Sequence, residues 1–270
     1  MAIRIGFGNH KGGSGKTSTV RNLAAALAEA GHRVLVVDLD PQANCSRRMA
    51  AKFDPLNPTL TTAEVIHANA DGVAAQAIRP CGWGAPYSAL IDVVPARYDL
   101  ENRVAEAGVV GAVHRLFRAL EGVDDDYAYT LVDFPPSLGH LTQLGLATVD
   151  AVVGVVEPEF DGVEGVIRLA EFVGNPHNRK ALDNADLRMI GYIISRVRAN
   201  LGAHEHQLRG MPALLGADLM WEPRVPERSA DKDASDSEVP LRELGSRARE
   251  HADVWKELAA TLVAKTKDMA

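Results

Sequence analysis

A short loop near the start of the chain carries the residue types that bind a nucleotide triphosphate. Its segment FGNHKGGSGKTS, residues 7–18, places three glycines just before a Lys-Thr pair. Gly12, Gly13 and Gly15 allow the backbone to wrap closely around phosphate, where its N–H groups face the anion. Lys16 is expected to reach the β and γ phosphates, and the Thr17 hydroxyl is expected to bind Mg²⁺. A glycine-rich turn without ligand is the alternative, and it is the weaker one between a predicted strand and a predicted helix.

The first half of this loop departs from the usual phosphate-loop pattern. That pattern has a glycine five residues before the glycine of the final Gly-Lys pair, where this chain has His10. A second lysine, Lys11, follows directly. The loop has therefore lost one glycine and gained one positive charge.

Carboxylates follow two further predicted strands. Asp38 and Asp40 come after the apolar run VLVV, and Asp133 comes after YTLV. In an open parallel sheet, ligands bind outside the carboxyl ends of the strands. We expect Asp133, opposite Thr17, to bind Mg²⁺ through water, and Asp40 to orient the attacking water. Asp40 is also a candidate to contact Mg²⁺ through water, and helix capping is the alternative role for an isolated aspartate.

Strand and helix patterns alternate along the chain and predict one α/β domain over residues 1–270. Apolar runs typical of strands occupy residues 3–8, 34–37, 90–94, 129–133, 151–156, 189–195 and 218–221. Helical spacing of apolar residues marks residues 17–29, 62–69, 100–120, 138–147, 163–173, 201–209 and 244–264. Thr61 and Glu64 are spaced as a capping box, and the polar residues 229–238 are expected to form a surface loop. The rhythm predicts a doubly wound, mostly parallel sheet with helices on both faces, and the phosphate-loop motif after the first strand is typical of the P-loop NTPase fold.

Composition excludes several classes of protein. The 270 residues are 46% apolar and 24% charged, which is typical of a globular protein and not of a disordered chain. No apolar run approaches the length of a membrane span, and the N-terminus lacks the features of a signal peptide, so a cytoplasmic protein is expected. Two cysteines, Cys45 and Cys81, have no metal-ligand spacing. The net charge of −7 argues against wholesale coating of nucleic acid.

The loop Lys11-Gly12-Gly13-Ser14-Gly15-Lys16-Thr17 resembles the ParA/MinD family of P-loop ATPases with a deviant Walker A motif, KGGxGK[ST]. This resemblance implies that residues 11–18, Ser14 and Ser18 included, bind ATP with Mg²⁺. It also implies that Lys11 is the signature lysine. In this family that lysine crosses to the partner's nucleotide when two subunits sandwich two ATP molecules, and it acts there as an arginine finger does in other NTPases.

Other segments extend the resemblance to the ParA partition proteins. DLDPQAN at residues 38–44 is similar to the ParA switch segment, and VVPARYDLE at residues 93–101 to a ParA strand-to-helix connection. LVDFPPSLGHLT at residues 131–142 and EPEFDGVEGV at residues 157–166 resemble the family's Walker B region and the segment after it. Beyond Val197 the match is loose, and only Pro226 and Arg228 are carried over, as adenine contacts.

The resemblance implies a slow, partner-stimulated ATPase that positions plasmid or chromosomal DNA on the bacterial nucleoid. ATP would drive homodimer formation, the dimer would bind DNA without sequence preference, and a ParB-like centromere-binding protein would trigger hydrolysis and release. The chain starts at its first strand, so we expect no N-terminal helix-turn-helix extension.

A local excess of positive charge identifies a candidate DNA surface. Residues 188–211 carry four arginines against one acid, Glu205, in a protein of net charge −7. The arginines are Arg188, Arg196, Arg198 and Arg209. We expect Arg196 and Arg198 to contact phosphates, most effectively when a dimer brings two copies of the strip together.

Three alternatives remain open. A MinD-like membrane-surface ATPase would need a C-terminal amphipathic helix, whereas Val254, Trp255, Leu258 and Leu262 are expected to dock on the core. A metabolic enzyme on the same fold, such as a reductase of the nitrogenase iron-protein type, is the second alternative, and the placement of the two cysteines disfavours that type. The third is a ParA-type ATPase whose cargo is a protein assembly, and the sequence does not distinguish it from one that partitions DNA. His204 and His206 are expected to be surface residues rather than metal ligands, because residues two apart on a helix face different ways.

Overall fold

The computed structural model describes residues 1–51, 56, 58–199 and 201–269. These residues form an eight-stranded sheet with the order β3-β4-β2-β5-β1-β6-β7-β8. β3 is antiparallel to β4, and all other neighbours in this sheet are parallel. The strands are β1 (Ile3–Gly8), β2 (Val34–Asp38), β3 (Arg79–Pro80), β4 (Ile91–Val94), β5 (Tyr129–Asp133), β6 (Ala151–Val156), β7 (Arg188–Ile194) and β8 (Met220–Trp221).

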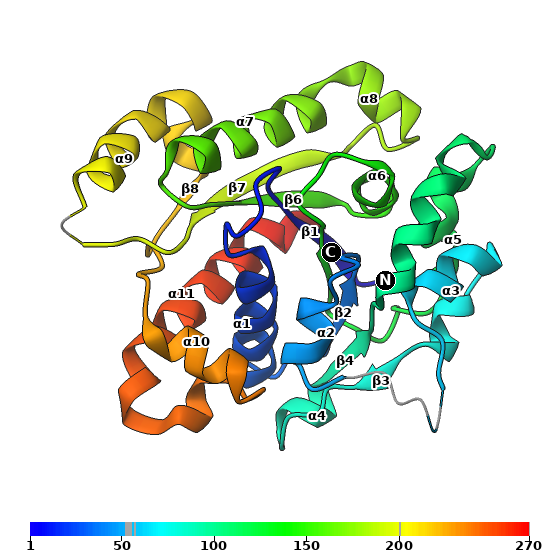
Figure 1. Ribbon diagram of the computed structural model, residues 1–270, viewed down its shortest axis with the longest axis horizontal. Helices are drawn as coiled ribbons and strands as arrows, with labels where there is room; N and C mark the ends of the chain where they lie inside the picture. Colours follow the sequence, from blue (N-terminus) through cyan, green and yellow to red (C-terminus); the bar gives the residue numbers. More distant parts are fainter. Residues whose placement is uncertain (52–55, 57, 200, 270) are drawn as a thin grey trace.

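Helices cover both faces of the sheet (Figure 1). One face packs against α1 (Lys16–Glu29), α2 (Asn44–Arg48), α4 (Tyr87–Leu90), α10 (Ser229–Asp236) and α11 (Arg249–Thr266). The other face carries α3 (Thr62–Ala68), α5 (Arg115–Ala119), α6 (His140–Leu146), α7 (Phe160–Gly174), α8 (Pro176–Ala181) and α9 (Gly202–Leu215). The predicted doubly wound, mostly parallel fold is confirmed.

Alternate side chains along a strand enter different hydrophobic cores, one on each face of the sheet. In β2, Val34 and Val36 belong to the core beneath α1 and α11, while Leu35 and Val37 belong to the core beneath α6. Successive side chains of a strand point to opposite faces, and both faces are covered here, so the run is apolar without interruption.

The C-terminal helix α11 docks on α1, as its apolar stripe predicts. Trp255, Leu258 and Leu262 are buried in the same core as the strands, and Val254 packs against it. None of the helices in the described part of the chain is long and apolar enough to span a membrane.

The segment after β4 corrects the helix predicted for residues 100–120. Two 3₁₀ segments, Tyr98–Gly108 and Ala112–His114, and the short helix α5 occupy it. Val109 is extended and Gly111 has a φ of 75°, so a continuous helix cannot pass through these residues.

The prediction of a loop over residues 229–238 is wrong, because most of this segment forms the helix α10. Ala230 and Ala234, one helical turn apart, are buried against the core. Sequence patterns also missed the short elements α2, α4, α8 and β3, whereas the capping box at Thr61 and Glu64 is present.

A buried ion pair joins β1 to the segment before β5. Arg4 donates from Nε and Nη2 to the two carboxylate oxygens of Asp124, at 2.8 and 2.9 Å, and the Thr130 hydroxyl donates to the same carboxylate. Both charged side chains are buried. Removal of one partner would leave an uncompensated charge in the interior, which is strongly destabilising.

We therefore expect Asp124→Ala to lower the free energy of unfolding by about 3 kcal/mol, measured by urea denaturation. Asp126→Ala is the matched control, since Asp126 is exposed and two residues away. Equal stability of the two variants would contradict the importance of this pair.

Candidate nucleotide site

The glycine-rich loop lies at the carboxyl end of β1, between the ends of β5 and β6, and leads into α1. Gly15 directly precedes α1 with a φ of 91°, and a Cβ there would lie 2.8 Å from the Ser195 hydroxyl. Only glycine fits this conformation and this space. The loop thus presents backbone N–H groups at the positive end of the α1 dipole, as an anion site requires.

Contacts with α7 hold the first half of the loop. The Asn9 amide nitrogen donates to the carbonyls of Val155 and Gly162, and the His10 N–H donates to the Gly165 carbonyl. A side chain at position 165 would collide with Asn9. The position that usually carries glycine is therefore bound to a neighbouring helix, which explains why histidine is accommodated there.

Lys16 lies beneath the loop. Its ammonium donates to the carbonyls of Lys11 and Asn9 at 3.1 and 3.3 Å. Burial lowers the pKa of Lys16, and the nearby carboxylates of Asp133 and Asp40 oppose that shift. A buried cation surrounded by carbonyl groups is well placed to offset the charge of a triphosphate.

Asp38 and Asp40 differ in role although they follow the same strand. Asp38 is fully buried and accepts hydrogen bonds from the Ser46 N–H, the Ser46 hydroxyl and the Asp40 N–H. Burial raises the pKa of Asp38 to about 6. Asp40 lines the cavity, and among the described residues its carboxylate accepts a hydrogen bond only from the Gln42 N–H. Asp38 therefore orders the segment, and Asp40 remains available for chemistry.

Asp133 and Thr17 form the pair that the sequence predicts for Mg²⁺. The strand register aligns Asp133 with Phe7 of β1 and Asp38 of β2, and the Thr17 hydroxyl donates to Asp133 Oδ2 at 2.8 Å. Within the described chain, Asp133 Oδ1 is buried and has no hydrogen-bond partner. Burial, together with repulsion from Asp38, raises the pKa of Asp133. An orphaned buried carboxylate oxygen beside a hydroxyl fits a hard divalent cation, bound directly or through water.

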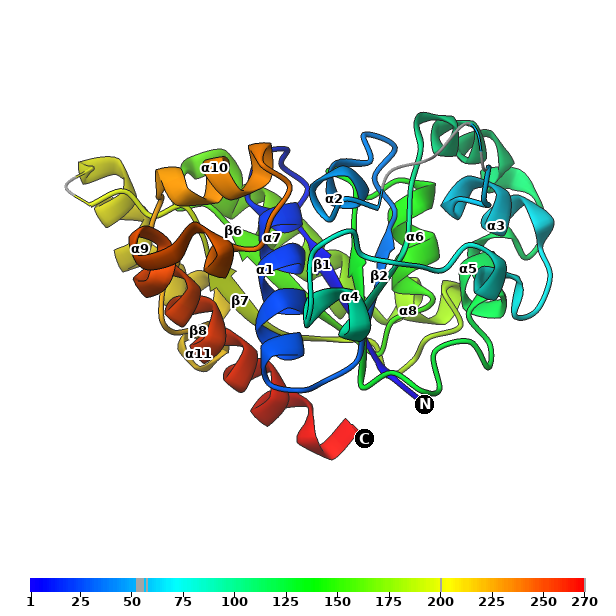
Figure 2. The ribbon, with the colours of Figure 1, turned by 90° about the horizontal axis from the view of Figure 1, so that it is seen from below.

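A cavity of about 770 Å³ opens in front of these residues. Figure 2 shows α2 and α10 at the same edge of the sheet as the loop before α1. The cavity is lined by Gly12–Thr19, Asp40, Asn44, Arg48, Pro136, Ser195, Arg196, Val225, Glu227, Arg228, Ser229, Asp231, Lys232, Ser235, Asp236 and Trp255. Ser18 and Arg228 thus lie at the cavity, whereas Pro226 is outside its lining and forms an isolated bridge with Val197.

A polar network ties α10 to α1 at the rim of this cavity. Asp231 accepts hydrogen bonds from Asn22 and His251, at 2.9 and 2.6 Å, and lies 3.6 Å from the buried Arg21 guanidinium. Burial by itself would raise the pKa of Asp231, but these partners hold it below its ordinary value. The polar pattern of residues 229–238 predicts a loop, so this wall of the cavity is not predicted from the sequence.

An ion pair that the sequence does not predict holds the Lys11 ammonium against Glu159. The ammonium contacts Glu159 Oε2 at 2.8 Å, and the Lys11 N–H donates to the Asn9 side chain. The hydrogen bond from Lys11 holds the pKa of Glu159 below its usual range. Glu159 directly precedes α7 and lies in the segment EPEFDGVEGV. The similarity of this segment to ParA proteins is the only sequence feature that points to Glu159.

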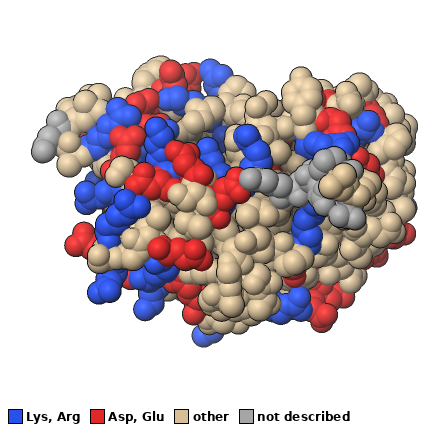
Figure 3. All heavy atoms as spheres, turned by 60° about the horizontal axis from the view of Figure 1, so that its bottom comes forward, with Lys and Arg blue, Asp and Glu red and all other residues tan. Residues whose placement is uncertain are grey.

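The strip of arginines predicted for DNA is not continuous. Arg188 is the first residue of β7, whereas Arg196 and Arg198 follow the carboxyl end of the same strand. Arg196 donates to the Gly13 carbonyl at 2.6 Å, and both Arg196 and Arg198 pair with Glu227. Figure 3 shows acidic and basic side chains intermixed on one face of the molecule.

Comparisons with known proteins agree with this geometry. The model of the AAA domain family AAA_31 matches residues 2–189. The chain is 35% identical to the chromosome partitioning protein ParA of Myxococcus xanthus over 213 residues, which is 76% of this chain and 70% of the relative. It is also 35% identical to the sporulation initiation inhibitor protein Soj of Bacillus subtilis over 208 residues, 75% of this chain and 76% of that protein.

A solved structure shares the fold over the whole chain. Cobyrinic acid a,c-diamide synthase from Mycobacterium smegmatis, crystallised with ADP and magnesium, superposes with a TM-score of 0.77. It is 25% identical in sequence, and the match covers 100% of this chain and 97% of that one. Together with the phosphate loop and its second lysine, these similarities show that the chain belongs to the ParA/MinD family of P-loop ATPases and resembles its ParA partition proteins.

Proposed function

We propose that this protein is a partition ATPase that hydrolyses ATP to ADP and phosphate and dimerises when ATP is bound. The observation that carries the proposal is the convergence of four groups on one cavity. These groups are the N-terminus of α1, Lys16, Thr17 and Asp40.

Each group has a distinct part in the proposed reaction. The loop N–H groups and Lys16 offset the charge of the triphosphate. Thr17 and Asp133 would hold Mg²⁺, which neutralises charge on the phosphate oxygens when it is bound. Asp40 orients water for in-line attack on the γ-phosphorus.

The proposed dimer completes this site with Lys11 of the second subunit. Lys11 and Lys16 are both at the loop, but Lys11 points to Glu159 and its side chain is one-quarter exposed. A lysine that lies outside the lining of its own cavity can serve a nucleotide held by another copy of the chain. Its charge would then stabilise the transferring γ-phosphoryl group.

The proposed cargo is plasmid or chromosomal DNA in the bacterial cytoplasm. Relatives that carry partition in their names support this proposal. In it, the ATP dimer binds nucleoid DNA without sequence preference, and a ParB-like centromere-binding protein stimulates slow hydrolysis and release. Arg196 and Arg198 are the proposed phosphate contacts, acting in two copies per dimer.

Two observations disfavour a MinD-like membrane ATPase and an iron–sulfur reductase, respectively. The apolar stripe of α11 is covered by the core, so this helix has no free apolar face for a membrane, as a MinD-like ATPase would need. Cys45 and Cys81 are buried free thiols, which does not suit an iron–sulfur cluster shared between subunits. An ATPase of the same family with a protein assembly as cargo is the alternative that keeps every feature of the site.

Lys11→Ala and Lys16→Ala are expected to fail at different steps. Lys16→Ala should lose ATP binding, because it removes the cation beneath the loop. Lys11→Ala should bind ATP as a monomer but form no dimer with a non-hydrolysable analogue, as measured by sedimentation. Lys180→Ala, on α8, serves as the control. Dimers of normal stability in Lys11→Ala would refute the role across the interface.

Asp40→Ala is expected to form ATP-dependent dimers that persist, because the variant binds nucleotide but does not position water. We expect hydrolysis to fall by about 100-fold or more in a single-turnover assay. Asn44→Ala tests whether any polar residue of this cavity wall has the same effect. A normal rate in Asp40→Ala would remove Asp40 from the mechanism.

DNA retention is expected to require ATP, to ignore sequence, and to weaken steeply with salt, since each neutralised phosphate adds about 0.9 to the salt slope. Arg198→Glu should impair retention without affecting ATP binding. Arg188→Glu, at the other end of the same strand, should not. Equal retention of random DNA by apo and ATP forms would contradict a surface built by dimerisation.

A further inference from the structure

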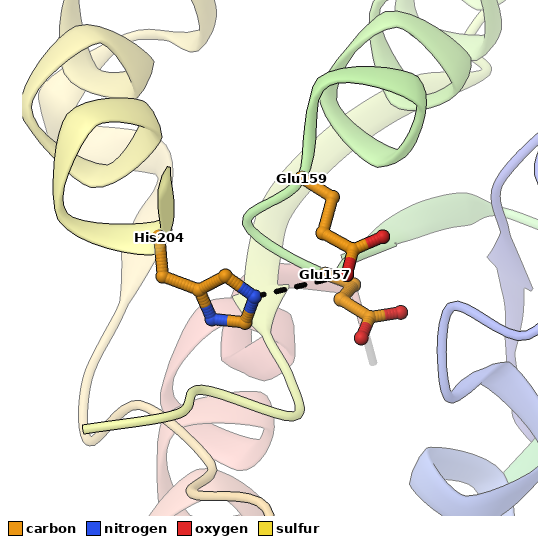
Figure 4. Close-up of side chains that lie close together, drawn as sticks. All are labelled: Glu157, Glu159 and His204. Atoms are coloured by element: carbon orange, nitrogen blue, oxygen red, sulfur yellow. Dashed lines mark ion pairs between the residues drawn. The ribbon is translucent and has the colours of Figure 1, made fainter. Parts of the chain in front are cut away.

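The Glu159 carboxylate lies between two nitrogen groups from different elements, one of which, the His204 ring, is drawn in Figure 4. One oxygen, Oε2, accepts the hydrogen bond from the Lys11 ammonium. The other, Oε1, lies 3.9 Å from Nε2 of His204, a residue of α9. Glu159 is therefore the link between the phosphate loop and a helix that is not otherwise part of the nucleotide cavity.

His204 is fully buried, which corrects its prediction as a surface residue, while His206 is exposed. The backbone N–H of Arg198 donates to His204 Nδ1 at 3.1 Å. A nitrogen that accepts a hydrogen bond carries no proton, so the neutral ring has its proton on Nε2. Across the described residues, Nε2 is buried without a hydrogen-bond partner. A buried N–H donor is thus directed at the Glu159 carboxylate.

The acidic side chains around His204 suggest a metal site as the alternative. Ligand atoms of Glu157, Glu159 and His204 all lie within 4.8 Å of one another. A metal would need the lone pair of His204 Nε2, but the bond from Arg198 places the proton there. The two carboxylates also have cations already, since Lys11 contacts Glu159 and Arg196 lies 3.7 Å from Glu157. The donor chemistry favours a hydrogen bond over a metal.

We infer that His204 is a positioning residue for Lys11, acting through Glu159. This inference rests on the proposed function, in which Lys11 serves the nucleotide of the second subunit. The Glu159 side chain is 39% exposed, so a single contact with a flexible lysine leaves it free to rotate. An approach of about 1 Å would turn the 3.9 Å separation into a hydrogen bond and fix the carboxylate. The fixed carboxylate then directs the lysine, and orientation of this kind raises the rate of transfer.

Two substitutions of His204 separate positioning from folding. Asparagine can accept from the Arg198 N–H, as Nδ1 does, but its amide is too short to reach Glu159. Glutamine can place an N–H donor near the position of Nε2. We expect His204→Asn to lower the ATP hydrolysis rate at saturating ATP about tenfold, with unchanged KM and monomer ATP affinity, and His204→Gln to restore most of the rate. A structural role predicts the opposite order, because asparagine preserves the bond to Arg198.

Controls make the result decisive. His206→Asn, on the same helix, should have no effect, and His204→Asn should add no further loss in a Glu159→Gln background. Normal hydrolysis in Lys11→Ala would overturn the role of Lys11 across the dimer, the part of the proposed function on which this inference rests. A loss in Lys11→Ala with none in His204→Asn would overturn only the positioning role. Uptake of one Zn²⁺ by the wild type but not by His204→Asn would also overturn it and identify a metal site.

Discussion

The balance of charge at the carboxyl ends of β1, β5 and β2 is the constraint on which the rest of the site depends. The parallel register places Asp38 beside Asp133, and it places Asp133 beside β1, where it accepts a hydrogen bond from Thr17. Both carboxylates are buried, and their pKa values are raised because a charge there is poorly solvated. The buried Lys16 ammonium compensates part of that charge. The site is therefore arranged so that a divalent cation and a polyanion, bound together, complete its electrostatics.

The unusual sequence of the loop follows from how its two halves are supported. Gly13, Gly15 and Lys16 form the half at the α1 N-terminus, and Gly13 and Gly15 have the positive φ that suits glycine. Asn9 and His10 form the half bound to α7, so a glycine is not needed there. This support turns Lys11 toward Glu159 and away from its own cavity. The same loop thus places Lys16 at the cavity and holds Lys11 against Glu159, outside the cavity lining.

Strong periodicity and motif chemistry made much of the architecture predictable. The strands of the parallel core, the helix after the loop and the positions of Thr17, Asp40 and Asp133 follow from local apolar runs and from the rule that ligands bind at carboxyl ends. α10 was not predictable in this way, because its composition is polar and only Ala230 and Ala234 are buried along it. Glu159 and His204 were missed because they come from different elements, 45 residues apart in the sequence, and meet only through tertiary packing.

The most direct test of the account is whether Lys11 acts in the other subunit. Lys11→Ala and Asp40→Ala variants, each expected to be inactive alone, should be mixed and their ATP hydrolysis measured. In a mixed dimer, the Lys11→Ala subunit keeps Asp40 in its cavity and receives Lys11 from its partner, so the account predicts that hydrolysis returns. If Lys11 served its own subunit, every cavity in the mixture would lack one of the two residues. A mixture as inactive as its components would contradict the account.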